Sequence, residues 1–386
     1  MIINTVKAIR PSDIQHFSWS RISQFQNIEN TTSVLINLHA LSSKSEKQNA
    51  KNQAGEIRHC LIQAKEYFEA AKNVSLATRP VLLYYSIMSM ALAEILLKQT
   101  GDSRLARLRE NHNCHGLTMS IKSNPKTEDP LEISASNLLC KPQLDSQNNP
   151  RGTFEVWKES AREYPVGSYR KVNLQNGAHH TSYQLHLLPS DSASPQLPPC
   201  GVSLLDCLVE LPYMSDVLFS LGVQPEIIRA GMSVYQEGIS GDRQSTIIIH
   251  PQNHGLIEKF GAKVKADAAS INYLEIIETL PSGYIIKQLE KSDSELIHHY
   301  PNSICLTDED IFFSCSDLNL NEFGLLYLAL HICGNFCRYY PEQWLKHVEK
   351  STPLAMAIDE LCHNSFERLP LLLLSELTRT YYVVKK

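Results

Sequence analysis

The sequence predicts a mainly α-helical fold with a mixed α/β middle. Long segments near both ends of the chain repeat apolar residues at spacings of three and four, whereas short strand-like segments separated by prolines fill the middle. We expect a helical N-terminal domain over residues 1–120, a mixed α/β region over 121–316 and a C-terminal helical region over 317–386. The C-terminal helices are expected to pack back on the N-terminal bundle, and 386 residues suffice for more than one core.

Two helices are expected at the centre of the N-terminal domain. Residues 56–72 place apolar side chains on one face and charges on the other. Pro80 suits the first turn of the second helix, which reaches Leu97 and is apolar nearly all round, as expected inside a bundle. This run meets the lower length limit for crossing a bilayer, but Glu94 interrupts it, which favours a buried core helix.

The rest of the chain mixes strand-like and helical segments. Strands are expected at residues 153–157, 183–188, 245–250, 284–289 and 304–315. Residues 203–221 are expected to form a helix despite Pro212 in its centre, and residues 117–152 a loop, because four prolines interrupt them. Residues 322–339 and 369–382 show the apolar pattern of two further helices.

Composition and charge favour a globular protein of the cytoplasm. Hydrophobic residues make up 43% and charged residues 20% of the chain, which argues against disorder, and a net charge of −5 argues against a protein that coats nucleic acid. The ten cysteines include no CxxC pair, as is typical of reduced, buried thiols. The N-terminus lacks the apolar segment of a secretory signal, so a cytoplasmic location is expected.

Five segments, taken in order, carry a resemblance to a known family. They are AKEYFEAAKNVSLATRPVLLYYSIMSMALAEILL (64–97), HGL (115–117), GTFEVW (152–157), SLLDCLVELPYMSDVLF (203–219) and FGLLYLALHICGNFCRYYPEQW (323–344). Together they resemble the YaaC-like proteins of bacteria, and their order extends the resemblance over most of the chain. The resemblance implies a shared fold and a bacterial cytoplasmic setting, and it brings no settled activity.

The densest polar cluster lies in residues 104–116. Arg107 and His112 form an R-x4-H spacing, and Arg109 and His115 form an R-x5-H spacing. These spacings resemble the signature of HEPN-type ribonucleases, which implies metal-independent RNA cleavage. In that chemistry a His acts as general base or acid at the ribose and leaving oxygens, while an Arg stabilises the charge on the phosphate. These four residues are the catalytic candidates.

The same cluster has a structural interpretation. Arg and His side chains near the end of a helix interact favourably with the helix dipole, and Gly116 can cap the helix in a left-handed conformation. The helix is expected to stop there, whereas helices of the HEPN type continue past the His. His112, Cys114 and His115 supply three side chains that can bind zinc, but no fourth ligand completes the pattern, so no metal is predicted.

A second cluster, of one Arg and three aromatic residues, closes the helix expected over residues 322–339. It consists of Arg338, Tyr339, Tyr340 and Trp344. Such a cluster can stack a nucleotide base, or it can fill a corner between packed elements. Packing is the favoured interpretation, because buried Trp and Tyr commonly fill such corners.

The leading functional hypothesis is a non-enzymatic interaction or scaffold component of a bacterial cytosolic assembly, in antiphage defence or stress response. It rests on the absence of a strong catalytic motif, including the glycine-rich loops GxxxxGK[ST] and GxGxxG. Its expected partner is another protein or a second copy, with RNA as a further candidate and no membrane. The alternatives are a HEPN-like metal-independent ribonuclease and a small-molecule or nucleotide sensor. No cofactor is predicted.

Overall fold

The computed structural model is mainly helical, as the sequence predicts. It describes residues 5–98, 104–160, 163–173, 179–189, 197–237, 244–251, 274–280, 283–289, 303–307, 311–316, 318 and 320–385. The helices are α1 (Ile14–Ile22), α2 (Ile28–Leu38), α3 (Lys44–Lys72), α4 (Arg79–Lys98), α5 (Leu105–Asn111), α6 (Leu131–Ser136), α7 (Thr153–Ser160), α8 (Leu204–Leu208), α9 (Ser215–Ser220), α11 (Glu322–Tyr339), α12 (Pro341–Glu349) and α13 (Pro353–Thr378). Short 3₁₀ turns, η1 (Ser23–Gln26) and η2 (Pro212–Met214), join neighbouring helices.

Strands form three sheets within the described residues. They are β1 (Thr5–Ile9), β2 (Leu117–Ile121), β3 (Leu138–Pro142), β4 (Glu163–Asn173), β5 (His179–Pro189), β6 (Val202–Ser203), β7 (Ile227–Glu237), β8 (Gln244–Pro251), β9 (Leu274–Leu280), β10 (Gly283–Leu289), β11 (Ser303–Cys305), β12 (Ile311–Ser314) and β13 (Thr380–Val384). The largest sheet has the order β11-β12-β7-β8-β10-β9, with β4 pairing with β5 and β7. The smaller sheets are β1-β13 and β2-β3-β6.

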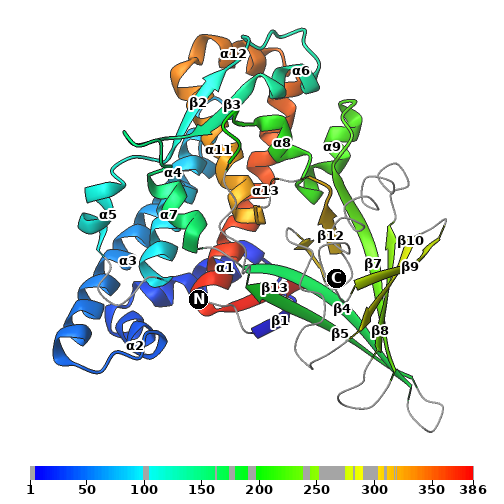
Figure 1. Ribbon diagram of the computed structural model, residues 1–386. Coiled ribbons are helices and arrows are strands. Elements are labelled where there is room, and N and C mark those ends of the chain that lie inside the picture. The colour runs from blue at the N-terminus through cyan, green and yellow to red at the C-terminus, as the bar shows by residue number, and fades with distance from the viewer. Residues whose placement is uncertain are drawn as a thin grey trace.

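Helix α4 is the centre of the helical core, where it packs against α3, α7, α11 and α13 (Figure 1). Small residues allow close approach on two of its sides. The Ser86 hydroxyl donates to the carbonyl oxygen of Ala64 in α3 at 2.8 Å. On α11, a Cβ at Gly334 would lie 3.0 Å from the Cβ of Tyr84. Both predicted N-terminal helices are therefore confirmed, and α3 begins earlier than expected, within the polar stretch at Lys44.

The charged groups of α4 are compensated inside the core. The Glu94 side chain accepts a hydrogen bond from the indole nitrogen of Trp157 in α7 at 2.7 Å. One turn further along, at the C-terminal end of the helix, the Lys98 ammonium lies 2.5 Å from the Glu376 carboxylate of α13, and both side chains are largely buried. A buried charge is costly without such a partner, so these contacts help to fix α7 and α13 against α4.

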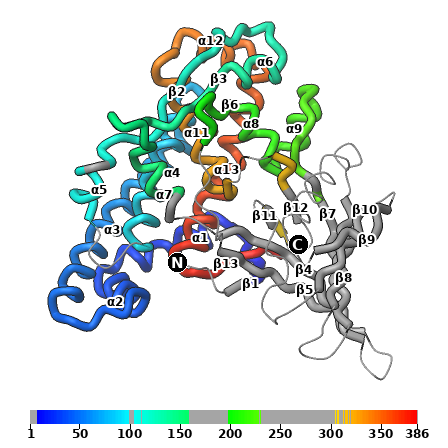
Figure 2. Tube along the Cα trace, viewed as in Figure 1, coloured from blue at the N-terminus to red at the C-terminus, as the bar shows by residue number. Residues whose placement is uncertain are grey.

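The two ends of the chain pack against each other. In Figure 2 the blue helix α1 lies beside the red helix α13, and the two helices are in contact. Strand β1 pairs in parallel with β13, with Thr5 opposite Thr380. Helices α11 and α13 are joined by a two-pronged ion pair from Arg368 to Glu322, at 2.6 and 2.7 Å. The expectation that the C-terminal helices pack on the N-terminal bundle is therefore confirmed.

Helix α4 meets the length and hydropathy criteria of a membrane span. Among the described residues it is the single helix that does so, and 72% of its apolar window is buried inside the fold. A core helix of a soluble protein passes the same test. The burial agrees with the interpretation drawn from Glu94, and it is consistent with a soluble protein.

The prediction of a strand at residues 153–157 is wrong, because this segment is the start of helix α7. Its first backbone N–H groups are satisfied by an outside segment: Thr153 donates to the carbonyl of Cys114 at 2.9 Å, and Phe154 to that of His115 at 3.1 Å. The alternation of polar and apolar residues over positions 153–156 is too short to exclude a helix, in which Phe154 and Trp157 share one buried face.

Three other predictions need correction. Residues 203–221 do not form one helix, since Pro212 starts η2 between α8 and α9. The helix expected over 369–382 is the second half of α13, and it ends at Thr378 before Arg379 (φ 53°) turns the chain into β13. Residues 117–152 are not all loop, because β2, α6 and β3 lie within them.

The remaining strand predictions are confirmed. Residues 183–188 lie in β5, 245–250 in β8 and 284–289 in β10, whereas 304–315 divides into β11 and β12. Buried side chains of α6, α7 and α8 belong to the same hydrophobic core as those of α3, α4 and α11. The division of the chain at residues 120 and 316 stays a prediction.

Two glycines permit a close crossing of backbones beneath α7. Gly116 and Gly152 have positive φ values of 87° and 104°. A Cβ at Gly152 would lie 2.3 Å from the Cα of Gly116, a distance that no side chain tolerates. Gly116 therefore adopts the expected left-handed conformation. It does not cap α5, which ends at Asn111, and instead allows the two backbones to cross.

We expect Gly152→Ala to lower the free energy of unfolding by more than ~2 kcal/mol, because it combines a left-handed backbone with a steric clash. Urea denaturation followed by circular dichroism measures this. The control is Gly55→Ala in α3, where a Cβ meets nothing within 4 Å. The control should gain about 0.5–1 kcal/mol from its helical position. Equal stability of Gly152→Ala and the unmodified protein would contradict the crossing.

Candidate functional site

Helix α5, which carries the two candidate arginines, is docked on α3. The backbone N–H of Leu105 donates to the Glu56 carboxylate at 2.6 Å. Arg107 and Arg109 are exposed on this helix. Arg109 lies near Cys60 of α3, since burial raises the pKa of that thiol to about 12 and the positive charge of Arg109 acts against the rise. The charge of Arg109 therefore acts on a buried side chain of α3.

His112 has a structural role at the backbone crossing. Its Nδ1 accepts a hydrogen bond from the backbone N–H of Gly152 at 2.9 Å, and its ring is half-buried. An imidazole nitrogen that accepts a hydrogen bond carries no proton, so Nδ1 is the unprotonated nitrogen of this ring. Together with the carbonyls of Cys114 and His115, His112 satisfies the backbone N–H groups at the start of α7.

His115 lies on the other side of the crossing, against α4. Its Nδ1 is 3.1 Å from the sulfur of Met88, and its ring meets the edge of Tyr84 at a centroid distance of 5.8 Å. A thioether sulfur can only accept, so Nδ1 carries the proton and Nε2 holds the free electron pair. Among the described residues, Nε2 of His115 has no hydrogen-bond partner. The residue is exposed, which leaves this nitrogen available to a ligand.

Arg338, in the last turn of α11, and His115 contact adjacent residues of α4, Tyr85 and Tyr84. One of the terminal nitrogens of Arg338 donates to the hydroxyl of Tyr85 in α4, and its guanidinium lies 5.1 Å from the ring centre of Tyr339. Tyr85 in turn stacks on Tyr67 of α3 at 5.4 Å. We call Tyr67, Tyr85, His115, Arg338 and Tyr339 the arginine–tyrosine surface. It combines a cation, a free imidazole nitrogen and aromatic rings.

The charge of Arg338 acts on His115. Partial burial of the ring and the positive charge of Arg338 lower the pKa of His115 from its ordinary value. Beneath it, burial and the charge of His115 lower the pKa of His331 to about 3. The His331 ring packs edge-on against Tyr84 at 5.1 Å. His331 is therefore a neutral part of the floor of the surface, and His115 is the histidine that faces solvent.

The second cluster expected from the sequence is divided between packing and the surface. Trp344 is fully buried, and its indole nitrogen donates to the carbonyl of Ala77 at 3.1 Å. Tyr340 is half-buried and lies 6.1 Å from the ring of Phe336. Both residues fill the corner between α11 and α12, as the packing interpretation states. Arg338 and Tyr339 instead point to the exposed side, and Tyr339 is 60% exposed.

The structure thus places the four predicted catalytic residues in different surroundings. The charge of Arg109 acts on a side chain of α3, whereas His112 is associated with the start of α7, and His115 with α4 and Arg338. The pairings of Arg107 with His112 and of Arg109 with His115 stay predictions. Sequence reasoning missed the approach of Arg338 to His115, although both residues lie in the segments that carry the family resemblance.

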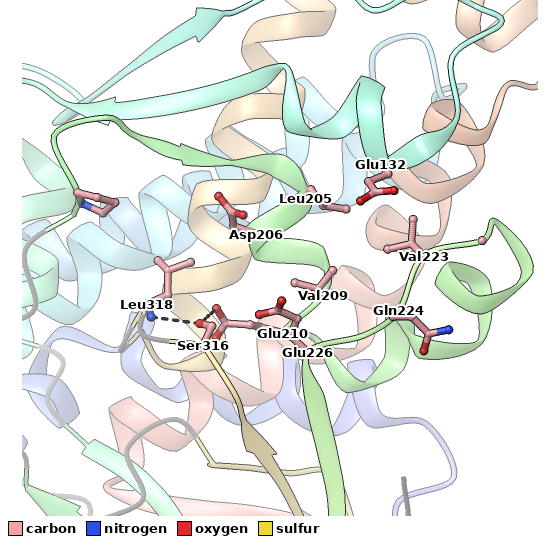
Figure 3. Close-up of a pocket in the computed structure, with 12 residues that line it drawn as sticks. Glu132, Leu205, Asp206, Val209, Glu210, Val223, Gln224, Glu226, Ser316 and Leu318 are labelled. Carbon is pink, nitrogen blue, oxygen red and sulfur yellow. Dashed lines mark hydrogen bonds between the residues drawn. The ribbon is translucent and has the colours of Figure 1, made fainter. Parts of the chain in front are cut away.

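A second candidate site is an acid-lined cavity of about 640 Å³ beside α6 and α8. Four carboxylates line it, and none of its lining residues in the described part of the chain is basic. Figure 3 shows them around one hollow: Glu132, Asp206, Glu210 and Glu226. Glu210 is buried, and its carboxylate accepts hydrogen bonds from the hydroxyls of Ser314, at 2.9 Å, and Ser316. These bonds stabilise a charged carboxylate in the wall.

Besides the four carboxylates, Gln224 and Ser316, the described lining of this cavity includes apolar side chains. Leu205, Val209, Val223 and Leu318 line it. Two large apolar side chains are exposed on the neighbouring helices, Ile133 of α6 at 51% and Phe219 of α9 at 53%. No group of three His, Cys, Asp or Glu side chains in the described part of the chain is arranged to hold a metal ion. The cavity therefore offers negative charge and apolar surface to a ligand.

Fold and sites together define a mainly helical protein with one exposed arginine–tyrosine surface and one acid-lined cavity. The family model of the YaaC-like proteins matches residues 23–139 and 169–377. The chain therefore belongs to the YaaC-like family, as its motifs suggest. No curated protein and no solved structure matches it.

We expect the His115 imidazole to titrate below its ordinary pKa of 6.5, and Arg338→Gln to raise that pKa, because the variant removes a nearby positive charge. Proton NMR of the histidine ring resonances as a function of pH measures both values. Arg58→Gln, which removes an exposed charge from α3, should leave the His115 pKa unchanged. A His115 pKa that is the same in all three proteins would contradict the proximity of Arg338.

Proposed function

We propose that the protein is an interaction component of a bacterial cytosolic assembly, and that its acid-lined cavity binds a basic segment of a partner protein. The observation that carries the proposal is the lining of the cavity, where the described residues include four carboxylates and no basic side chain. This agrees with the expectation of a scaffold or interaction role in defence or stress response.

The electrostatics of the cavity favour a cationic occupant. Glu132 and Asp206 are exposed at the cavity, and Glu226 is half-buried. Like charges gathered in a hollow with apolar walls concentrate the electric field and attract counter-ions. Two serine hydroxyls donate to the Glu210 carboxylate, and these hydrogen bonds stabilise its negative charge in the wall. A Lys or Arg side chain from a partner would be attracted to the exposed carboxylates of Glu132 and Asp206 at the cavity.

The apolar walls favour a peptide segment over a free ion. Val209 and Val223 are buried in the wall, and Leu205 and Leu318 are partly exposed to the hollow. Exposed Ile133 and Phe219 extend apolar surface onto the neighbouring helices. A segment that alternates basic and apolar side chains matches both features, since apolar contact supplies affinity and charge supplies specificity.

A labelled peptide of alternating Lys and Leu residues is expected to bind, and the matched peptide of Glu and Leu is not. Fluorescence anisotropy measures the affinity, which should fall as salt rises, because exposed ion pairs are screened. The double variant Glu132→Gln/Glu226→Gln should weaken binding about tenfold, since each partly exposed ion pair contributes on the order of 1 kcal/mol. Unchanged binding by this variant would refute the proposal.

The matched control for the peptide experiment removes two exposed carboxylates elsewhere. Glu128→Gln/Glu349→Gln changes the net charge by the same amount and leaves the cavity intact. If the control variant weakens binding as much as the cavity variant does, the attraction comes from overall charge and not from the cavity. Circular dichroism spectra of both variants establish that the fold is kept.

A metal-independent ribonuclease is the second candidate, and the free Nε2 of His115 near Arg338 favours it. His115 would accept the proton of a ribose 2′-OH while the 2′-oxygen bonds to phosphorus and the bond from phosphorus to the 5′-oxygen breaks. The leaving 5′-oxygen would take a proton from water, and Arg338 would stabilise the charge on the phosphate. We expect cleavage of a mixed RNA pool in EDTA to fall at least ~100-fold in His115→Gln and in Arg338→Gln. Arg109→Ala tests the pairing drawn from the sequence. Intact RNA with the unmodified protein excludes the enzyme, and equal cleavage by every variant identifies a contaminant.

A further inference from the structure

The arginine–tyrosine surface combines groups that the core does not need. Tyr84, Tyr327 and His331 are buried and form a packed floor. Above them, Arg338 and His115 are exposed, and Tyr339 has the largest exposed fraction among the exposed large hydrophobic side chains of the described residues. An exposed aromatic ring beside a cation gains little from packing, so this ring is available to stack on a ligand.

We infer that the arginine–tyrosine surface binds a nucleoside phosphate, with the phosphate at Arg338 and His115 and the base stacked on Tyr339. The inference concerns binding alone. It involves α4, α11 and the segment before β2, whereas the acid-lined cavity lies beside α6 and α8. It therefore stands independently of the partner proposed for that cavity.

The phosphate end of this site is formed by the guanidinium of Arg338 and the imidazole of His115. Arg338 donates one hydrogen bond to Tyr85, and this contact orients its planar guanidinium while other N–H groups stay free to donate. Two parallel N–H groups of a guanidinium match two phosphate oxygens. Nε2 of His115 lies on the same surface, and a phosphate dianion beside it favours the protonated, donating ring.

The base end of the site is formed by aromatic rings. Tyr339 presents an exposed ring on which a base can stack, and Arg338 lies against the same ring at 5.1 Å. Stacking on an aromatic side chain is available to every base, because each base has a π face. Tyr67 and Tyr85, stacked at 5.4 Å, widen this aromatic area from α3 and α4. The site is therefore expected to tolerate different bases and to require the phosphate.

Calorimetric titration with adenosine 5′-monophosphate tests the inference, beside adenosine, which lacks the phosphate, and ribose 5-phosphate, which lacks the base. We expect the nucleotide to bind at least about tenfold more tightly than either fragment. Arg338→Gln should weaken binding about tenfold or more, since the variant loses a charge-assisted hydrogen bond to the phosphate. Tyr339→Ala should weaken it about fivefold or more, because the base loses the ring on which it stacks.

Two control variants remove similar side chains outside the surface. Arg58→Gln removes an exposed Arg of α3, and Leu345→Ala removes an exposed apolar side chain of α12. Both should bind the nucleotide as the unmodified protein does, and thermal unfolding establishes that all four variants are folded. The His115 ring resonances should shift when the nucleotide is added, because the phosphate lies beside the imidazole.

Two results would overturn the inference. One is the absence of nucleotide binding at millimolar concentration by the unmodified protein. The other is binding that survives both Arg338→Gln and Tyr339→Ala, since the ligand would then lie elsewhere. A nucleoside monophosphate has no internucleotide bond to cleave, so the outcome is read separately from the ribonuclease test, and failure of either leaves the other result intact.

Discussion

The structure depends on the burial of one helix, α4, on nearly all of its sides. A helix that is apolar all round must be covered all round, and here α3, α7, α11 and α13 supply the cover. Close approach requires small residues, such as Ser86 toward α3 and Gly334 toward α4. It also requires partners for the charges on α4, so Trp157 and Glu376 are fixed at Glu94 and Lys98.

The arginine–tyrosine surface follows from this packing. Successive residues of a helix point about 100° apart, so Tyr84 faces the core while Tyr85 reaches the edge of the α4–α11 interface. There Tyr85 meets Arg338, which lies at the last turn of α11. The crossing of Gly116 and Gly152 then places His115 against α4. A rigid core thus positions exposed polar groups that come from segments far apart in the chain.

Sequence patterns failed where a short segment fits two structures. Residues 153–156 alternate polar and apolar side chains as a strand does, but Phe154 and Trp157 also share one face of a helix. The helix is favoured by hydrogen-bond acceptors from residues 112–115, which satisfy the N–H groups at the start of α7. These residues are distant in sequence, so the pattern of residues 153–157 does not reveal them. The prediction of a helix over residues 369–382 failed for a different reason. Arg379 adopts a left-handed conformation that ends α13, and the residues after it form β13 by pairing with β1.

The sequence by itself determined the helical class of the fold, the long core helices and the family, because apolar periodicity and ordered motifs are local properties of the chain. It also identified His115, Arg338 and Tyr339 as residues of interest. Only the tertiary structure decided that His112 caps α7 while His115 lies beside Arg338, and that four carboxylates meet in one cavity. These relations join residues distant in sequence, and packing around α4 sets them.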